Sequence, residues 1–123
     1  MRLTDREFEE LVRQALQELP PGIQNAMENL AILVEEWPSG EELEEAGLVE
    51  PGELFGLYRG VPLPEREGLP PPLPDTITLY QGSIELACHS REQVVQELRV
   101  TLLHEVGHYL GMGEVDLEAL GYG

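Results

Sequence analysis

The chain has 123 residues, 41% of them hydrophobic, and a chain of that length buries about two thirds of its unfolded surface. Its formal net charge is −17, from 24 acidic residues against seven arginines and no lysine. Such a surface repels nucleic-acid phosphates and anionic membranes, so neither is an expected partner, whereas it attracts cationic peptides and divalent metal ions. We expect one domain over residues 1–123.

The sequence also carries signals of location. The N-terminal residues are polar and lead into an amphipathic helix, unlike a signal peptide. No apolar run is long enough to span a bilayer. Cys88 is the single cysteine, which excludes an internal disulfide and fits a reducing compartment. These features predict a cytoplasmic protein.

An amphipathic helix is predicted near the N-terminus. Thr4 and Glu7 form a capping-box pattern at its start, and two prolines, Pro20 and Pro21, stop it. Its apolar residues recur at helical spacing, which indicates one buried stripe: Phe8, Leu11, Val12, Ala15, Leu16 and Leu19.

The middle of the chain predicts short elements. A helical turn over residues 23–28 precedes the apolar, partly β-branched run 30–34, which predicts a buried strand. The acidic residues 41–46 predict one exposed helical turn with a solvated face. A second strand is expected at 54–58, and the apolar–polar alternation at 76–80 predicts a half-exposed strand.

A long helix is predicted after a short one at residues 83–88. Ser90 and Gln93 form a capping-box signature at its start. Its broad apolar face consists of Val94, Val95, Leu98, Leu102, Leu103 and Val106. Cys88 and His89 stand just upstream, and we interpret them as structural or incidental rather than as metal ligands. A short helix is expected at 115–120.

The long helix contains the pattern H-E-x-x-H, with His104, Glu105 and His108. Helical residues four apart are separated by about 400° and about 6 Å of rise, so the two histidines project from one face and can share a metal ion. Glu105 lies about 100° from His104, where a general base can take a proton from a metal-bound water. Two of the chain's three histidines fall in this pattern, which argues against coincidence.

A third ligand is expected after the helix. Gly111 offers a left-handed C-cap that lets the chain double back. Glu114 can then supply an anionic ligand, and Asp116 is the alternative. Two histidines, a carboxylate and an open water position form a common catalytic zinc site, although another divalent metal would fit.

The chain from about residue 50 to its end resembles the small bacterial zincin-like metallopeptidase domains. The resemblance rests on residues 54–60 (LFGLYRG), 73–80 (LPDTITLY) and 101–111 (TLLHEVGHYLG), and residues 29–38 also fit. It implies a minimal zincin-like α+β fold, with a small mixed β-sheet packed against the H-E-x-x-H helix and an N-terminal helix. It further implies a metal on that helix and an edge strand, 54–58 or 76–80, that pairs with an extended peptide substrate.

The leading functional hypothesis is a zinc-dependent metallopeptidase that hydrolyses peptide bonds through metal-activated water, with Glu105 as general base. Tyr80, Tyr109 and Tyr122 are candidate donors to the transition state or the substrate. The alternative is a non-catalytic metal-binding or interaction domain with a zincin fold, because so short a chain has little sequence left for specificity pockets. A third hypothesis is a structural α+β domain whose H-E-x-x-H is coincidental.

Overall fold

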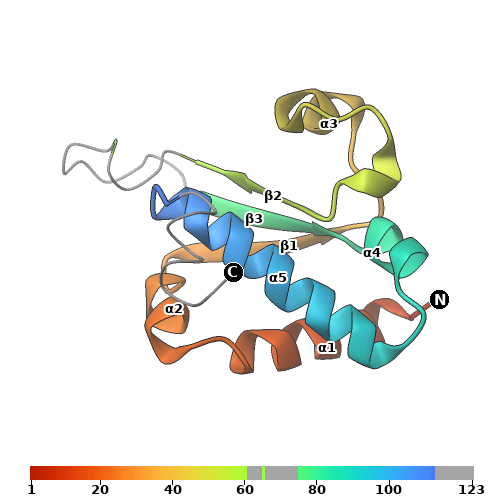
Figure 1. Ribbon diagram of the computed structural model, residues 1–123, viewed down its shortest axis with the longest axis horizontal. Coiled ribbons are helices and arrows are strands. Elements are labelled where there is room, and N and C mark those ends of the chain that lie inside the picture. The colour runs from red at the N-terminus through yellow and green to blue at the C-terminus, as the bar shows by residue number, and fades with distance from the viewer. Residues whose placement is uncertain (61–64, 66–74, 113–123) are drawn as a thin grey trace.

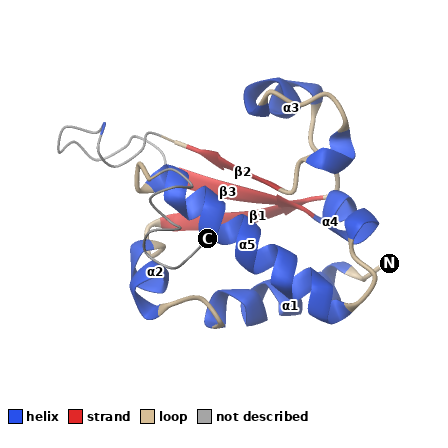
Figure 2. Ribbon diagram, in the orientation of Figure 1, coloured by secondary structure: helices blue, strands red, loops and turns tan. Residues whose placement is uncertain are grey.

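The computed structural model describes residues 1–60, 65 and 75–112. Helices and strands are interspersed along the chain (Figures 1 and 2). Their order is α1 (Asp5–Gln17), α2 (Pro21–Ala26), β1 (Leu30–Glu35), α3 (Gly40–Ala46), the 3₁₀ turn η1 (Pro51–Glu53), β2 (Gly56–Arg59), β3 (Asp75–Tyr80), α4 (Gln81–Ala87) and α5 (Arg91–Tyr109). The helix expected at 115–120 lies outside the described residues.

The three strands form one mixed sheet in the order β1-β3-β2. β1 runs parallel to β3, whereas β2 is antiparallel to it. α5 crosses the sheet and packs against β2 and β3, and α1 packs against α5 (Figure 1). The α+β architecture predicted from the sequence is therefore confirmed, including a mixed sheet packed against the H-E-x-x-H helix and the N-terminal helix.

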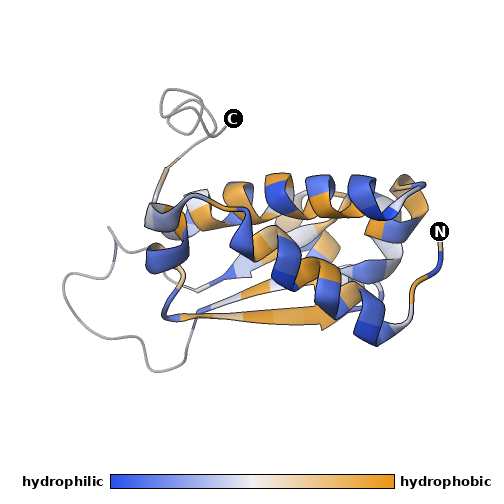
Figure 3. Ribbon diagram, turned by 90° about the horizontal axis from the view of Figure 1, so that it is seen from below, coloured by the Kyte–Doolittle hydropathy of each residue, from blue (hydrophilic) through white to orange (hydrophobic). Residues whose placement is uncertain are grey.

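The core lies between α1, α5 and the sheet. Phe8 and Ala15 of α1 and Leu98 and Leu102 of α5 are completely buried in it. Both long helices show hydrophilic and hydrophobic residues in Figure 3, as amphipathic helices do. The capping box of Thr4 and Glu7 is present in full, so the predicted start of α1 is confirmed. Among the described residues, no helix combines the length and apolarity that a membrane crossing requires.

The burial predicted for two strands is wrong. β1 was expected to be buried, but it is an edge strand in which Leu33 and Val34 are 46% and 38% exposed. β3 was expected to be half exposed, but it is the central strand, and Ile77, Leu79 and Thr78 are buried. Strand order decides which strand is covered, and a single strand's own residues do not encode its neighbours.

The acidic segment of α3 is not wholly solvated, contrary to the sequence prediction. Glu42 and Leu43 are 4% and 8% exposed. Glu42 completes a capping box with Ser39, and its Oε2 accepts a hydrogen bond of 2.5 Å from the Tyr80 hydroxyl. This contact attaches α3 to the end of β3, away from the layer of α1 and α5 (Figure 1).

Candidate metal centre

The second half of α5 presents the H-E-x-x-H residues to β2. Ser90 caps the helix by accepting a hydrogen bond from the backbone N–H of Gln93. The Gln93 side chain accepts from the N–H of His89 rather than closing a capping box on Ser90. The helix then continues without a break to Tyr109, so the predicted helical placement of the motif is confirmed.

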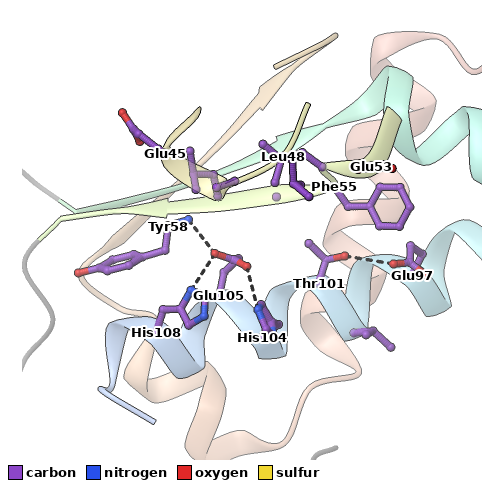
Figure 4. Close-up of a pocket in the computed structure, with 15 residues that line it drawn as sticks. Glu45, Leu48, Glu53, Phe55, Tyr58, Glu97, Thr101, His104, Glu105 and His108 are labelled. Carbon is purple, nitrogen blue, oxygen red and sulfur yellow. Dashed lines mark hydrogen bonds and ion pairs between the residues drawn. The ribbon is translucent and has the colours of Figure 1, made fainter. Parts of the chain in front are cut away.

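The three motif side chains converge in space. His104 Nε2 lies 3.8 Å from Glu105 Oε2, and His108 Nδ1 lies 3.3 Å from Glu105 Oε1. The two imidazole centroids are 4.5 Å apart, and one ligand atom from each of the three residues lies within 4.8 Å of the others. Figure 4 shows the carboxylate between the imidazoles and the strand. The Glu105 side chain is only 7% exposed, whereas those of His104 and His108 are 39% and 49% exposed.

These donors fit a zinc ion. Imidazole nitrogens bind Zn²⁺ at about 2.0–2.1 Å, so two of them on a tetrahedral ion stand about 3.4 Å apart. One nitrogen of each histidine lies within 4.8 Å of the other, and the partial exposure of the two side chains leaves the rings room to turn toward a shared ion. Imidazole nitrogens also suit other divalent transition metals.

α5 ends in the left-handed C-cap at Gly111 that the sequence predicted. Gly111 is left-handed, with φ of 73°. The N–H of Met112 donates to the Gly107 carbonyl at 2.7 Å, and the N–H of Gly111 donates to the His108 carbonyl at 3.1 Å. These two bonds form a Schellman motif directly after the second histidine. The third-ligand candidates Glu114 and Asp116 lie outside the described residues.

The backbone of β2 holds the Glu105 carboxylate in place, a contact that was not predicted from the sequence. The N–H of Tyr58 donates a hydrogen bond of 2.9 Å to Glu105 Oε1 (Figure 4). The Tyr58 ring also packs edge-on against Tyr109, with centroids 5.8 Å apart, and its hydroxyl donates to Asp75. A backbone donor leaves no side-chain signature, so the pattern of residue types did not reveal it.

A second missed feature is the close approach of β2 to α5 at Gly56. A Cβ built on Gly56 would lie 2.6 Å from Thr101 Cγ2. The sequence does offer a signal, because a glycine inside a predicted strand often marks a close approach. The sequence analysis singled out no strand glycine for this role.

Two of the tyrosines proposed as substrate contacts, Tyr80 and Tyr109, are buried. Tyr80 is fully buried and donates its hydroxyl to Glu42, and burial followed by that carboxylate raises its pKa. Tyr109 is 3% exposed and packs on Tyr58. Neither residue lines the cleft at the motif, and Tyr122 lies outside the described residues.

Cys88 is buried, which raises its thiol pKa, and the described metal group does not include it.

A cleft of about 590 Å³ extends from the two histidines along β2. α5 forms one wall, and β2 with the end of α3 forms the other (Figure 4). Its apolar lining includes Leu48, Phe55 and Val100, and its acidic lining includes Glu45, Glu53 and Glu97. The cleft therefore leads directly to the Glu105 carboxylate.

A family model described as zincin-like metallopeptidase matches residues 27–123. The chain belongs to this family. The match covers every described element from β1 to α5 and leaves α1 and α2 outside it. No curated protein matches the chain. Family membership indicates a hydrolase of the metallopeptidase type and a metal at the His104–Glu105–His108 group, with zinc as the expected ion.

Proposed function

We propose that the protein is a zinc-dependent metallopeptidase in which Glu105 is the general base. One observation carries the proposal: a buried carboxylate stands between two imidazoles at the head of an open cleft. His104 and His108 would hold the metal, and Glu114, with Asp116 as the alternative, would complete the ligand set. The left-handed C-cap at Gly111 ends α5 directly after the second histidine and supports a ligand from the residues that follow it.

When bound, Zn²⁺ lowers the pKa of a water molecule towards about 7 and polarises the substrate carbonyl. The protein's own contribution is proton transfer by Glu105. Its Oε1 accepts the Tyr58 N–H, which leaves Oε2 to take a proton from the attacking water. Glu105 then passes the proton to the leaving amine. Its low exposure strengthens these electrostatic interactions, because little water screens them.

The proposed substrate is an extended peptide that lies along β2. β2 is an edge strand that lines the cleft, whereas β3 is central and paired on both sides. The edge-strand role implied by the family resemblance therefore goes to β2 rather than to β3. The cleft is lined by Glu53, Glu97 and Glu45, of which Glu45 pairs with Arg59 at 2.9 Å, and no arginine is among the described lining residues. Neutral or basic peptides are thus better probes than acidic ones.

The test is hydrolysis of a set of quenched fluorescent peptides by zinc-reconstituted protein, compared with Glu105→Gln and His104→Ala. The glutamine can still accept the Tyr58 N–H, so this variant should keep its fold and its zinc while losing turnover. His104→Ala should lose zinc as well, which elemental analysis reports. Turnover that survives in Glu105→Gln would contradict the proposed base. Zinc binding without turnover in the parent protein would favour the non-catalytic metal-binding domain.

A further inference from the structure

β2 and α5 contact each other at two successive points. Gly56 faces Thr101, and Tyr58 bonds to Glu105. Two strand residues advance about 6.7 Å and four helical residues about 6 Å, so the spacing of the two contacts is nearly the same along the strand and along the helix. The separation of strand and helix at the first contact therefore sets the separation at the second.

The first contact leaves no room for a side chain on the strand. A Cβ on Gly56 would lie 2.6 Å from Thr101 Cγ2 and 3.3 Å from the Thr78 carbonyl oxygen. Gly56 is buried, and its φ is not among the positive values that favour glycine. This position therefore requires a glycine for space, not for backbone conformation.

The second contact depends on that separation. The Tyr58 N–H reaches Glu105 Oε1 at 2.9 Å, within the range of about 2.7–3.2 Å that such hydrogen bonds occupy. Carbon atoms in ordinary contact stand about 3.5–4.0 Å apart, so a methyl group on Gly56 would push the strand outward by about 1 Å and take this bond out of that range. The buried carboxylate would then lack its backbone donor, and His108 Nδ1, 3.3 Å away, would compete for Oε1.

We propose that Gly56 is a positioning residue for Glu105. Its missing side chain lets β2 approach Thr101, and this approach brings the Tyr58 N–H within reach of the catalytic carboxylate. The catalytic consequence rests on the proposed peptidase function. The contact itself can be tested without turnover.

The variant that tests the spacing is Gly56→Ala, and its matched control is Gly22→Ala. Gly22 has open space where a Cβ would stand, so the control adds the same methyl group without a clash. Gly56→Ala should lower kcat/KM by about a hundredfold, since a small displacement of a catalytic group has effects of that order. Both variants should bind zinc as the parent does, because neither touches His104 or His108.

Rescue distinguishes a steric spacer from a general loss of stability. Thr101→Ser removes the Cγ2 atom that the new methyl group would strike. In the Gly56→Ala background it should restore kcat/KM to within a few-fold of the Thr101→Ser single variant. The expected signature is thus a double-mutant cycle with a large favourable coupling.

Amide hydrogen exchange of Tyr58 supplies a readout independent of activity. The Tyr58 amide should exchange slowly in the parent and in Gly22→Ala, rapidly in Gly56→Ala, and slowly again in the double variant. If Gly56→Ala does not fold, a folded double variant with a protected Tyr58 amide supports the proposal. A double variant that also fails to fold overturns it, because Thr101 Cγ2 would then not be the main obstacle.

Two further results would overturn the proposal: unchanged Tyr58 protection in Gly56→Ala, or no rescue by Thr101→Ser. A parent protein that hydrolyses no peptide would refute the proposed function instead. In that case, amide exchange alone would decide whether Gly56 sets the spacing of β2 from α5.

Discussion

Glu42 and Glu105 are both buried carboxylates in a strongly acidic protein, yet their surroundings differ. Glu42 Oε1 accepts the Ser39 N–H at 2.8 Å and its Oε2 accepts the Tyr80 hydroxyl at 2.5 Å. Glu105 Oε1 accepts the Tyr58 N–H at 2.9 Å, whereas its Oε2 faces His104 Nε2 at 3.8 Å. Glu42 thus has both oxygens bound, whereas Glu105 has Oε1 anchored by the Tyr58 N–H and Oε2 facing His104.

The difference separates a structural carboxylate from a chemical one. Hydrogen bonds on both oxygens satisfy the buried charge of Glu42 and fix α3 in place, and neither oxygen faces the cleft. A carboxylate with one anchored oxygen keeps its orientation and can still accept a proton on the other. Their positions agree with these roles, because Glu105 lines the cleft and Glu42 does not.

The largest expected effect is opposite behaviour of two glutamine variants. Glu105→Gln should lower kcat about 10²- to 10⁴-fold with little change in unfolding free energy, because its amide oxygen can still accept the Tyr58 N–H. Glu42→Gln should lower the unfolding free energy by about 1–3 kcal/mol and leave kcat close to that of the parent. Peptide hydrolysis and urea unfolding measure the two effects. Equal losses of activity in both variants would remove the distinction.

A smaller effect is expected from removing the donor to Glu42. Tyr80→Phe keeps the buried ring and deletes only the hydroxyl, so it should cost about 1–3 kcal/mol, the penalty for a buried acceptor that loses its partner. Urea unfolding at neutral pH measures it. The same substitution in the Glu42→Gln background should cost less, because an amide oxygen is a weaker acceptor than a carboxylate. An equal cost in both backgrounds would show that Tyr80 acts through packing alone.

The sequence predicted the parts of the site that lie on a single helix. Capping residues and the four-residue spacing of His104 and His108 determine how α5 runs and where it presents its ligands. Gly111 likewise indicated the left-handed C-cap of α5, because a left-handed residue is most easily a glycine. Interactions of this kind are local, so neighbouring residues carry enough information to define them.

The parts that depend on pairing between distant segments were not predictable. The order of the strands made β1 an edge and β3 the centre, opposite to what their own residues indicated. The Tyr58 donor to Glu105 joins residues 47 positions apart through the backbone. The burial of Tyr80 on Glu42 joins residues 38 positions apart. No residue type marks such contacts before the sheet is assembled.

The smallest expected effect is the pH dependence of stability at the Glu42–Tyr80 contact. Burial is the largest influence on the pKa of Glu42 and raises it. The Tyr80 hydroxyl, the Ser39 cap and Arg59 together outweigh it, so the pKa lies below its ordinary value of 4.5. The stabilisation from this group is therefore complete above about pH 4.5 and is lost as the pH falls through the lower folded value. Tyr80 has a raised pKa, so its contribution is complete below its ordinary value of 10.0 and is lost as the pH rises further.

This prediction can be tested by measuring the unfolding free energy of the parent and of Glu42→Gln from about pH 3 to pH 8. The difference between the two proteins isolates the contribution of Glu42 ionisation, because the other carboxylates titrate in both. The difference between the two proteins should be constant at neutral pH and should shrink below about pH 4.5. Glu35 opposes this trend, because burial and the nearby Glu42 raise its pKa, and its protonation relieves that repulsion in the parent as the pH falls. The observed decrease is thus smaller than Glu42 alone would give. A difference that grows towards low pH would mean that repulsion from Glu35, and not the bond to Tyr80, dominates at Glu42.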